Sequence, residues 1–455
     1  MTKHETHHGM SKVPLIWSLL DQIILSAFSL ILNLVLIRLW APAVFGVFAT
    51  LLALSMVFYS IQQALIGGQL AVLRQQAFDS VDEQHLLSSL WMANCVLVGT
   101  AVMMTAAGIE LIGGDQYPDL AISGALFVGG SLLREYARSL LFSEFNVFAV
   151  IETDAIFIAS AVAGFGLLWS WGGDFHLAEI LFVLAAASSA ALLPSIFRRR
   201  SAFALQFDGS VPRRYLGIWQ NQSRWALLGV ISSEIINRAH VFVVGAWFGT
   251  AAVGVLQAGD MIFRPLGLML HAWKRVAQPT FSACVARANL GTMRRLTQLS
   301  VLAGIAVSLL YMAAIWLLWP VLEEHVFRGQ YANIEIVAAL WALTVVLRII
   351  TGIYSTQLEG FARFRELSFT SLAGACVALV SLFIVVALGS YQWSILAIAA
   401  GLVVDIVLVT LVLHKLMTAA HRQAPAGNDS SAQGSIVFEG NGNVRQRLSG
   451  LQPSK

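Results

Sequence analysis

The chain has 455 residues, of which 58% are hydrophobic and only 12% are charged. A soluble domain carries about 25% charged residues and fewer apolar ones, so this composition excludes an ordinary soluble protein and indicates a polytopic membrane protein. The formal net charge of +3 does not indicate a nucleic-acid-binding protein, because the basic surplus of a membrane protein usually lies in its cytoplasmic loops.

The N-terminal segment 1–14 is polar and has no apolar core that ends at a small-residue cleavage site. We therefore expect no removable signal peptide, and the first membrane span acts as its own insertion signal. The three cysteines, Cys95, Cys284 and Cys376, lie far apart and form no CxxC pair, so the sequence indicates neither a metal cluster nor a disulfide framework.

Twelve apolar runs follow, each of roughly 20 residues, which is the length an α-helix needs to cross the ~30 Å hydrocarbon core. The first six runs are 15–39, 43–66, 86–108, 120–141, 145–169 and 177–196. The last six runs are 225–248, 251–273, 296–319, 334–354, 367–387 and 393–413. The predicted fold is therefore an all-α polytopic membrane protein with about 12 transmembrane helices.

A basic polar stretch separates the sixth run from the seventh. It contains five arginines, which are Arg198, Arg199, Arg200, Arg213 and Arg214. The chain is thus predicted to consist of a cytoplasmic N-terminus (1–14), a six-helix bundle (15–197), a basic cytoplasmic linker (198–224), a second six-helix bundle (225–416) and a disordered cytoplasmic tail (417–455).

Basic residues fall in alternate loops. If the N-terminus is cytoplasmic, the loops on that side contain Arg74, the five linker arginines, Lys274, Arg275, Arg287, Arg294, Arg295, Arg363, Arg365 and Lys415. The opposite loops contain Glu110, Asp115, Asp174, Glu323 and Glu324, with Arg328 as their one basic residue well outside the core. The positive-inside bias therefore predicts that both termini are cytoplasmic.

The two halves of the sequence echo one another. Residues 40–47 (Trp-Ala-Pro-Ala-Val-Phe-Gly-Val) follow the first run, and residues 247–255 (Trp-Phe-Gly-Thr-Ala-Ala-Val-Gly-Val) follow the seventh. Six spans separate the copies, so both halves enter the membrane from the same side. If the repeat is real, the two halves are therefore parallel and related by an axis along the membrane normal. The alternative is two unrelated tight turns at the membrane interface.

These two turns, the glycine-rich segment 64–69 that leads to Arg74, the basic central loop and the 6+6 plan together carry a family resemblance. Over about residues 15–413 the sequence resembles the polysaccharide-export and lipid-linked oligosaccharide flippase branch of the multidrug/oligosaccharidyl-lipid/polysaccharide (MOP) exporter superfamily. The resemblance implies two helical bundles around a central cavity in the bacterial inner membrane. That cavity would open alternately to each side and carry an undecaprenyl-pyrophosphate-linked glycan outward.

The same resemblance implies the partners and the important helices. The substrate would be a lipid-linked glycan, the surroundings membrane lipids, and the protein partners a polysaccharide polymerase and glycosyltransferases. Polar residues on spans one, two, seven and eight would matter most.

Ionisable groups on spans seven and eight are therefore candidates for substrate binding, since charges are costly in lipid and normally face a cavity or a partner. Two pairs of an acid and an arginine are spaced at i, i+4, which places both partners on one helical face. They are Glu234 with Arg238, which have Asn237 between them, and Asp260 with Arg264. In one interpretation Arg238 and Arg264 bind pyrophosphate oxygens through the guanidinium fork. In the other, each arginine is merely neutralised by its own carboxylate.

Other membrane-embedded charges leave their partners open. Arg134 and Arg138 share a helical face, Glu135 can pair with Arg138, and Arg134 is a further candidate for substrate binding. Arg348 and Asp405 have no opposite charge nearby in sequence, so each needs a partner from another helix or water.

The acids are the candidates for ion coupling, and they are Asp21, Glu234, Asp260 and Asp405. Asp21 fits either uptake of a proton or sodium ion or a snorkelling acid at the interface, and Glu152 and Asp154 carry the same ambiguity.

No nucleotide-hydrolysis or dinucleotide motif is present, and no cofactor or metal is expected. Transport would thus draw on an ion gradient or a glycan-lipid gradient. Two further functions remain as alternatives. A cation-coupled multidrug exporter of the same superfamily shares the twelve spans, and a membrane-embedded glycan polymerase or ligase would be an enzyme that normally has a large outer loop.

Overall fold

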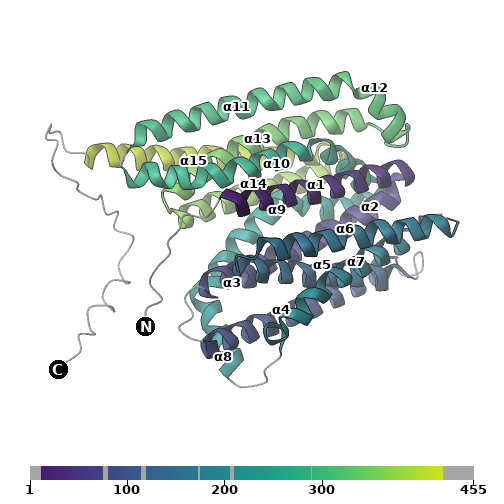
Figure 1. Ribbon diagram of the computed structural model, residues 1–455. Helices are drawn as coiled ribbons and strands as arrows, with labels where there is room; N and C mark the ends of the chain where they lie inside the picture. The colour runs from purple at the N-terminus through teal and green to yellow at the C-terminus, as the bar shows by residue number, and fades with distance from the viewer. Residues whose placement is uncertain are drawn as a thin grey trace.

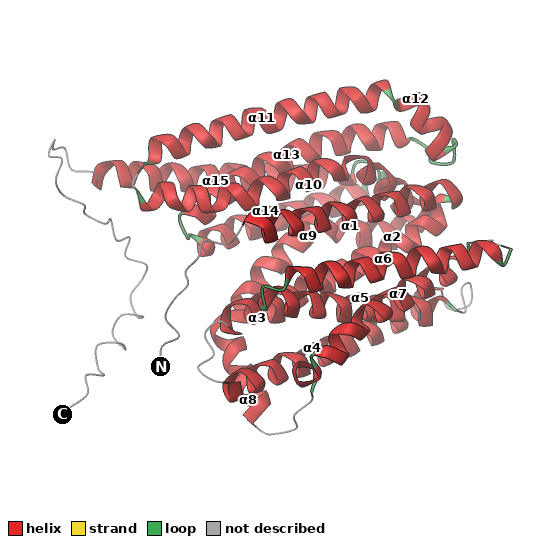
Figure 2. Ribbon diagram, in the orientation of Figure 1, coloured by secondary structure: helices red, strands yellow, loops and turns green. Residues whose placement is uncertain are grey.

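The computed structural model describes residues 12–74, 80–113, 119–172, 175–204, 210–287 and 289–423. Within these ranges the chain consists of helices joined by short loops, and no strand occurs (Figure 2). The predicted disordered tail was 417–455, but residues 417–423 belong to the helix α15, and the rest of the tail lies outside the described residues. So does the predicted N-terminal segment before Lys12.

Twelve of the described helices are long, and each overlaps one predicted run. In the first half of the chain they are α1 (Lys12–Leu39), α2 (Pro42–Gln62), α4 (Ser80–Gly113), α5 (Leu120–Ser143), α6 (Val147–Ser170) and α7 (Leu177–Arg198). In the second half they are α9 (Arg224–Phe248), α10 (Thr250–Ala286), α11 (Leu290–Leu317), α13 (Ile334–Gly360), α14 (Phe364–Ala387) and α15 (Ser394–Gln423).

Short helical segments extend or connect the long helices. They are the π-turn η1 (Gln63–Gly67) with α3 (Gly68–Leu73), the 3₁₀ turn η3 (Arg200–Phe203), α8 (Ser210–Ile218) with the π-turn η4 (Trp219–Ser223), and α12 (Trp319–Leu322) with the π-turn η5 (Glu323–Phe327). The predicted linker is thus partly helical, because η3, α8 and η4 lie within it.

Eleven of the described helices are long and apolar enough to cross a membrane, so the protein is a multi-pass membrane protein. The exception among the twelve long helices is α5, in which Arg134, Glu135 and Arg138 lower the hydropathy. Its 24 residues give a length of ~36 Å, which is nevertheless sufficient to span a bilayer.

The helices of the two halves pack in the same pattern. In the first half α5 packs on α4 and α7, α6 packs on α1 and α7, and α2 packs on α5. In the second half α13 packs on α11 and α15, α14 packs on α9 and α15, and α10 packs on α13. Each pairing recurs six long helices later, and α1, α2, α9 and α10 lie between the two groups (Figure 1).

The two halves are in direct backbone contact where α2 crosses α10. A Cβ atom on Gly46 would overlap the carbonyl oxygen of Thr250, and a Cβ atom on Gly254 would overlap that of Pro42. The contact is therefore reciprocal. Both glycines belong to the echoed turns of the sequence, so the echo places two backbones in direct contact, which only residues without a side chain allow.

We refer to the end of the molecule that contains the α1–α2 and α9–α10 turns as the hairpin end. There Trp40 donates a hydrogen bond from Nε1 to the carbonyl oxygen of Phe175 at 2.7 Å. Tyr331, which precedes α13, donates to the carbonyl oxygens of Ile37 and Trp40 at 3.2 and 3.3 Å. Burial raises the pKa of the Tyr331 hydroxyl, so this group stays protonated and joins the second half of the chain to the end of α1.

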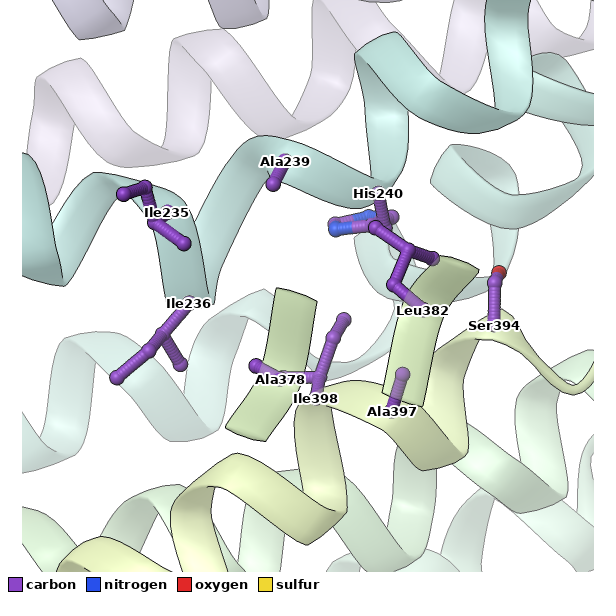
Figure 3. A pocket seen from close by; sticks show the side chains of 9 residues that line it. All are labelled: Ile235, Ile236, Ala239, His240, Ala378, Leu382, Ser394, Ala397 and Ile398. Atoms are coloured by element: carbon purple, nitrogen blue, oxygen red, sulfur yellow. The ribbon is translucent and has the colours of Figure 1, made fainter. Parts of the chain in front are cut away.

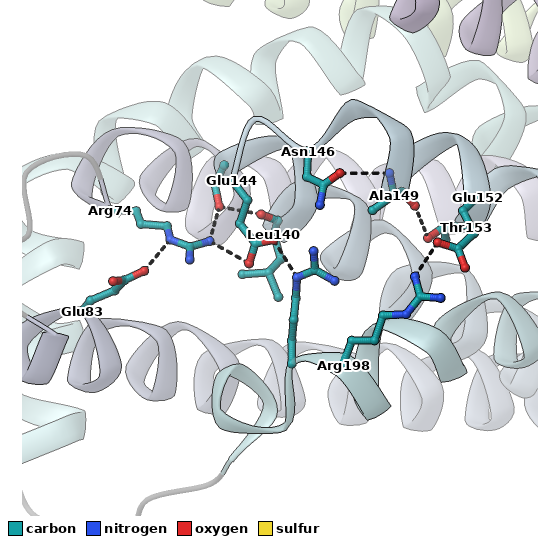
Figure 4. A network of polar contacts seen from close by, with 11 residues as sticks. Arg74, Glu83, Leu140, Glu144, Asn146, Ala149, Glu152, Thr153 and Arg198 are labelled. Carbon is teal, nitrogen blue, oxygen red and sulfur yellow. Dashed lines mark hydrogen bonds and ion pairs between the residues drawn. The ribbon is translucent and has the colours of Figure 1, made fainter. Parts of the chain in front are cut away.

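The opposite end, which we call the linker end, is held by ion pairs (Figure 4). The Glu144 carboxylate forms ion pairs with Arg74 at 3.2 Å and with Arg199 at 2.6 Å, and Arg74 forms a further ion pair with Glu83 at 2.7 Å. The α5–α6 turn is thereby tied to the ends of α3 and α7. Arg198, by contrast, is an exposed partner of Glu152 at 2.5 Å.

Candidate functional site

Five ionisable residues gather where α9, α10 and α13 meet, and we call them the α9–α10 cluster. They are Glu234, Arg238, Asp260, Arg264 and Arg348. Arg238 donates from Nε to Glu234 at 2.5 Å, as the i, i+4 spacing predicts. Asp260 instead contacts Arg348 at 3.4 Å, which supplies the partner from another helix that Arg348 was expected to need.

Arg264 differs from the other two arginines of this cluster. Among the described residues no carboxylate lies within 4 Å of its guanidinium, although Asp260, one turn earlier, interacts with it electrostatically. Neutralisation of Arg264 by its own carboxylate, one of the two interpretations of the sequence, is therefore incomplete, because Asp260 contacts Arg348. Pro265 follows directly and removes the backbone donor that would otherwise bond the carbonyl of Met261, so the helix is locally polar here.

Aromatic and imidazole groups form one wall of the α9–α10 cluster. The Arg348 guanidinium lies 4.9 Å from the centre of the Trp341 ring, and Trp341 donates from Nε1 to the carbonyl of Leu256 at 2.8 Å. His240 packs edge-on against the same tryptophan, with ring centres 5.5 Å apart. This wall desolvates one face of Arg348, which strengthens its interactions with anions.

A second group, the α5 cluster, lies among α1, α5 and α6. It consists of Asp21, Arg134, Glu135, Arg138 and Asp154. Arg138 contacts Glu135 at 2.9 Å, Asp154 at 3.0 Å and Asp21 at 3.9 Å. Three carboxylates thus surround one guanidinium, and the predicted Glu135–Arg138 pair is confirmed.

Arg134 is held beside this group in an aromatic setting. Its guanidinium lies 3.8 Å from the centre of the Phe157 ring and 3.2 Å from Glu135. Its Nε and Nη1 atoms are buried and have no hydrogen-bond partner among the described residues. Donors of this kind are expensive to leave unpaired, so Arg134 has spare capacity for an anion or water.

Two neighbouring residues of α2 connect the clusters. Tyr59 interacts electrostatically with Glu135, Arg138 and Arg134 of the α5 cluster. Ser60 donates from Oγ to Glu234 Oε1 at 2.8 Å, and thus reaches the α9–α10 cluster. Sequence reasoning missed both residues, because a neutral hydroxyl on a membrane helix carries no charge or motif that would mark it.

The remaining predicted candidates lie apart from the ion pairs. Asn237 donates its amide to the carbonyl oxygen of Ser233 on its own helix at 2.8 Å. Asp405 is 3% exposed and interacts with the Thr370 hydroxyl, but none of the described cations lies within ion-pair distance of it. Asp154, left ambiguous by the sequence, belongs to the α5 cluster, whereas Glu152 is at the surface.

A small cavity with room for about one water molecule lies among α9, α14 and α15. Its lining is apolar except for His240 and Ser394 (Figure 3). Ligand pockets typically measure 300–1,000 Å³, so this cavity is too small for a lipid-linked sugar. The two charge clusters, not this cavity, are the better candidates for the functional site.

No protein-family model and no curated protein sequence matches the chain. Solved structures do match in fold. An inward-facing multidrug resistance MATE family transporter of the MOP superfamily superposes with a TM-score of 0.66 at 13% identity, covering 88% of this chain and 96% of the other. The lipid II flippase MurJ in an inward closed conformation gives 0.66 at 12% identity, covering 90% and 91%.

An outward-facing MATE family transporter gives a TM-score of 0.57 at 12% identity, covering 90% of this chain and 95% of the other. The chain therefore has the fold shared by these transporters. It superposes better on the two inward structures than on this outward one.

Proposed function

We propose that the protein is a transporter that carries a polyprenyl-pyrophosphate-linked oligosaccharide across the bacterial inner membrane by alternating access. The observation that carries this proposal is the composition of the α9–α10 cluster, in which three arginines face two carboxylates. A surplus guanidinium in a membrane protein is costly unless it meets an anion. Pyrophosphate offers oxygens in the geometry that a guanidinium binds bidentately.

The architecture that we propose for this task has twelve spans in two six-helix bundles. In this proposal α5 also crosses the membrane and brings the eleven apolar spans to twelve, because its charged residues are paired within the bundle and not exposed to lipid. The bundles are 15–197 and 225–416, joined by the linker 198–224. Both termini are cytoplasmic, since the arginine-rich turns lie at the linker end and Glu323 and Glu324 lie at the hairpin end.

We assign substrate binding to Arg238, Arg264 and Arg348, with Asn237 beside them on α9. Arg134 is a further candidate, because two of its nitrogen atoms are buried without a hydrogen-bond partner among the described residues. Paired acids keep the arginines solvated while no substrate is bound. Membrane lipids surround the helices, and a polysaccharide polymerase and glycosyltransferases are the proposed partners.

Ion coupling is proposed to involve acids that are not fully neutralised by arginines. Asp21 fits this role best among the predicted acids, because it shares Arg138 with Glu135 and Asp154. Asp405 remains a second candidate, since it is buried away from the arginines. Glu234 and Asp260 each have an arginine partner, so they are better suited to hold Arg238 and Arg348 in place.

A cation-coupled multidrug exporter is the second candidate, and one observation favours it. The α5 cluster contains three carboxylates and two arginines, so that side of the molecule could accept an organic cation. A glycan polymerase or ligase is less well supported, because the connections at the hairpin end are short.

Cells that lack the gene distinguish these functions. We expect glycan-linked polyprenyl lipid to accumulate on the cytoplasmic leaflet and surface polysaccharide to fall, while efflux of organic-cation dyes is unchanged. Plasmid-borne wild type should restore export, and Arg264→Gln should restore it only weakly although the protein is inserted. Normal surface polysaccharide together with impaired dye efflux would favour the drug exporter instead.

A further inference from the structure

We infer that Ser60 is a positioning residue for an anion bound at Arg238, so that the anion site is assembled from both halves of the chain. This inference rests on the proposed function and specifies how its binding site is built. Ser60 does not contact the anion in this proposal. It acts through Glu234, which lies between the hydroxyl and the guanidinium.

Glu234 links Ser60 to Arg238. Its two carboxylate oxygens have separate partners, since Oε1 accepts from Ser60 Oγ at 2.8 Å and Oε2 accepts from Arg238 Nε at 2.5 Å. The Glu234 side chain is 14% exposed, so water competes little for these bonds. One residue of α2 thus fixes the rotation of a carboxylate on α9, and that carboxylate fixes the guanidinium one turn further along.

Arg238 has one edge of its guanidinium available for an anion. Glu234 is bonded at Nε, and both Nη groups have no protein partner among the described residues. The Arg238 side chain is 27% exposed, which leaves the Nη edge accessible. A guanidinium whose plane is already fixed loses less conformational freedom when it binds a phosphate group bidentately. The preferred ligand is therefore a di- or monophosphate ester, bound at this edge.

The Ser60–Glu234 bond joins two helices from different halves of the chain. Ser60 belongs to α2, in the first half of the chain, and Glu234 belongs to α9, in the second half. The helices of these two halves repeat the same packing. A shift of α2 relative to α9 would break the Ser60–Glu234 bond and release Arg238 from its fixed orientation. Anion affinity would then differ between two arrangements of the halves, which is the condition for a ligand to shift their populations.

Binding of farnesyl pyrophosphate to the purified full-length protein in detergent tests the inference by isothermal titration calorimetry. We expect Ser60→Ala to weaken binding about tenfold, as loss of one charge-assisted hydrogen bond would. Ser60→Thr retains the hydroxyl and should bind within about threefold of wild type. Ser55→Ala makes the same chemical change on the same helix and is the matched control, with affinity expected to be unchanged.

A double mutant separates positioning from a general structural role. In the Arg238→Gln background, Ser60→Ala should cause no further loss of affinity, because the residue that Ser60 orients is gone. Thermal denaturation checks that each variant is folded, and Ser60→Cys replaces Ser60→Ala if the alanine variant is not. An undiminished affinity in Ser60→Ala, or an equal loss in both backgrounds, overturns the inference. Wild-type affinity in Arg238→Gln would instead reject the proposed function.

Discussion

Asp260 holds Arg348 in the α9–α10 cluster, with 3.4 Å between its Oδ1 atom and Nη1 of the arginine. Its spacing from Arg264 predicts a local pair, yet its carboxylate contacts Arg348 on a different helix. The Glu234–Arg238 and Glu135–Arg138 pairs were predictable because both partners lie within one turn of a helix. The Asp154–Arg138 and Ser60–Glu234 contacts depend on how helices pack, which local spacing does not specify.

The charge balance of the α9–α10 cluster yields a prediction about stability. Asp260→Asn leaves Glu234 as the one carboxylate beside the three arginines of this cluster. We therefore expect the free energy of unfolding to fall by an amount on the order of 2 kcal/mol. This is below the cost of breaking a fully buried pair, since the Asp260 and Arg348 side chains are 19% and 27% exposed. Arg348→Gln should cost less, because Arg264 can then turn to Asp260. Thermal denaturation in detergent measures both effects.

The double variant is the control for this prediction. Asp260→Asn combined with Arg348→Gln removes one charge of each sign and should be more stable than Asp260→Asn alone. A double variant less stable than Asp260→Asn would show that Asp260 does not act by neutralising Arg348.

At the scale of helices, the existence of the long elements was predictable and their lengths were not. All twelve apolar runs are helical, because a run of that length has few alternatives in a membrane. However, α10 ends at Ala286, whereas its predicted run ended at Trp273. Residues such as Lys274, Arg275 and Gln278 end the hydrophobic pattern without ending the helix, since polar residues are good helix formers outside lipid.

The crossing of α2 and α10 yields a prediction about a single methyl group. Gly46→Ala and Gly254→Ala should each destabilise the protein by about 1–3 kcal/mol, because the new Cβ overlaps a backbone carbonyl that cannot rotate away. Gly267→Ala on α10 is the matched control, since no atom lies within 4 Å of its Cβ position and alanine favours a helix. Thermal denaturation should therefore separate the two crossing variants from the control. Equal stability of all three would mean that the backbones are not in contact.

At the scale of the whole molecule, the repeated packing gives physical meaning to a short echo in the sequence. Two turns with little identity place Gly46 and Gly254 in equivalent positions, and neither turn alone predicts that they touch. The sequence predicted the order of the helices and the basic linker. It did not predict which faces meet, because eleven of the long helices in the described part of the chain are predominantly apolar, so polarity distinguishes their faces poorly.

Labelling of single cysteines tests the proposed orientation of the molecule. In a background without Cys95, Cys284 and Cys376, an impermeant thiol reagent should modify a cysteine at Gly113 in intact cells. Cysteines at Gly209 and Ser430 should be modified only after lysis, because the linker and the tail are proposed to be cytoplasmic. Labelling of position 209 from outside would contradict the twelve-span arrangement.

Reconstitution of the purified protein into liposomes tests whether it moves a lipid-linked glycan across a membrane. A polyprenyl-pyrophosphate-linked oligosaccharide with a fluorescent sugar is placed in both leaflets, and its exposure is followed by quenching from outside. Wild type should move the lipid-linked glycan between leaflets well above the rate in protein-free liposomes, and Arg238→Gln, inserted to the same extent, should be slower by about tenfold or more. Glycan-lipid movement no faster than in empty liposomes, together with uptake of an organic-cation dye, would reject the flippase and favour the drug exporter.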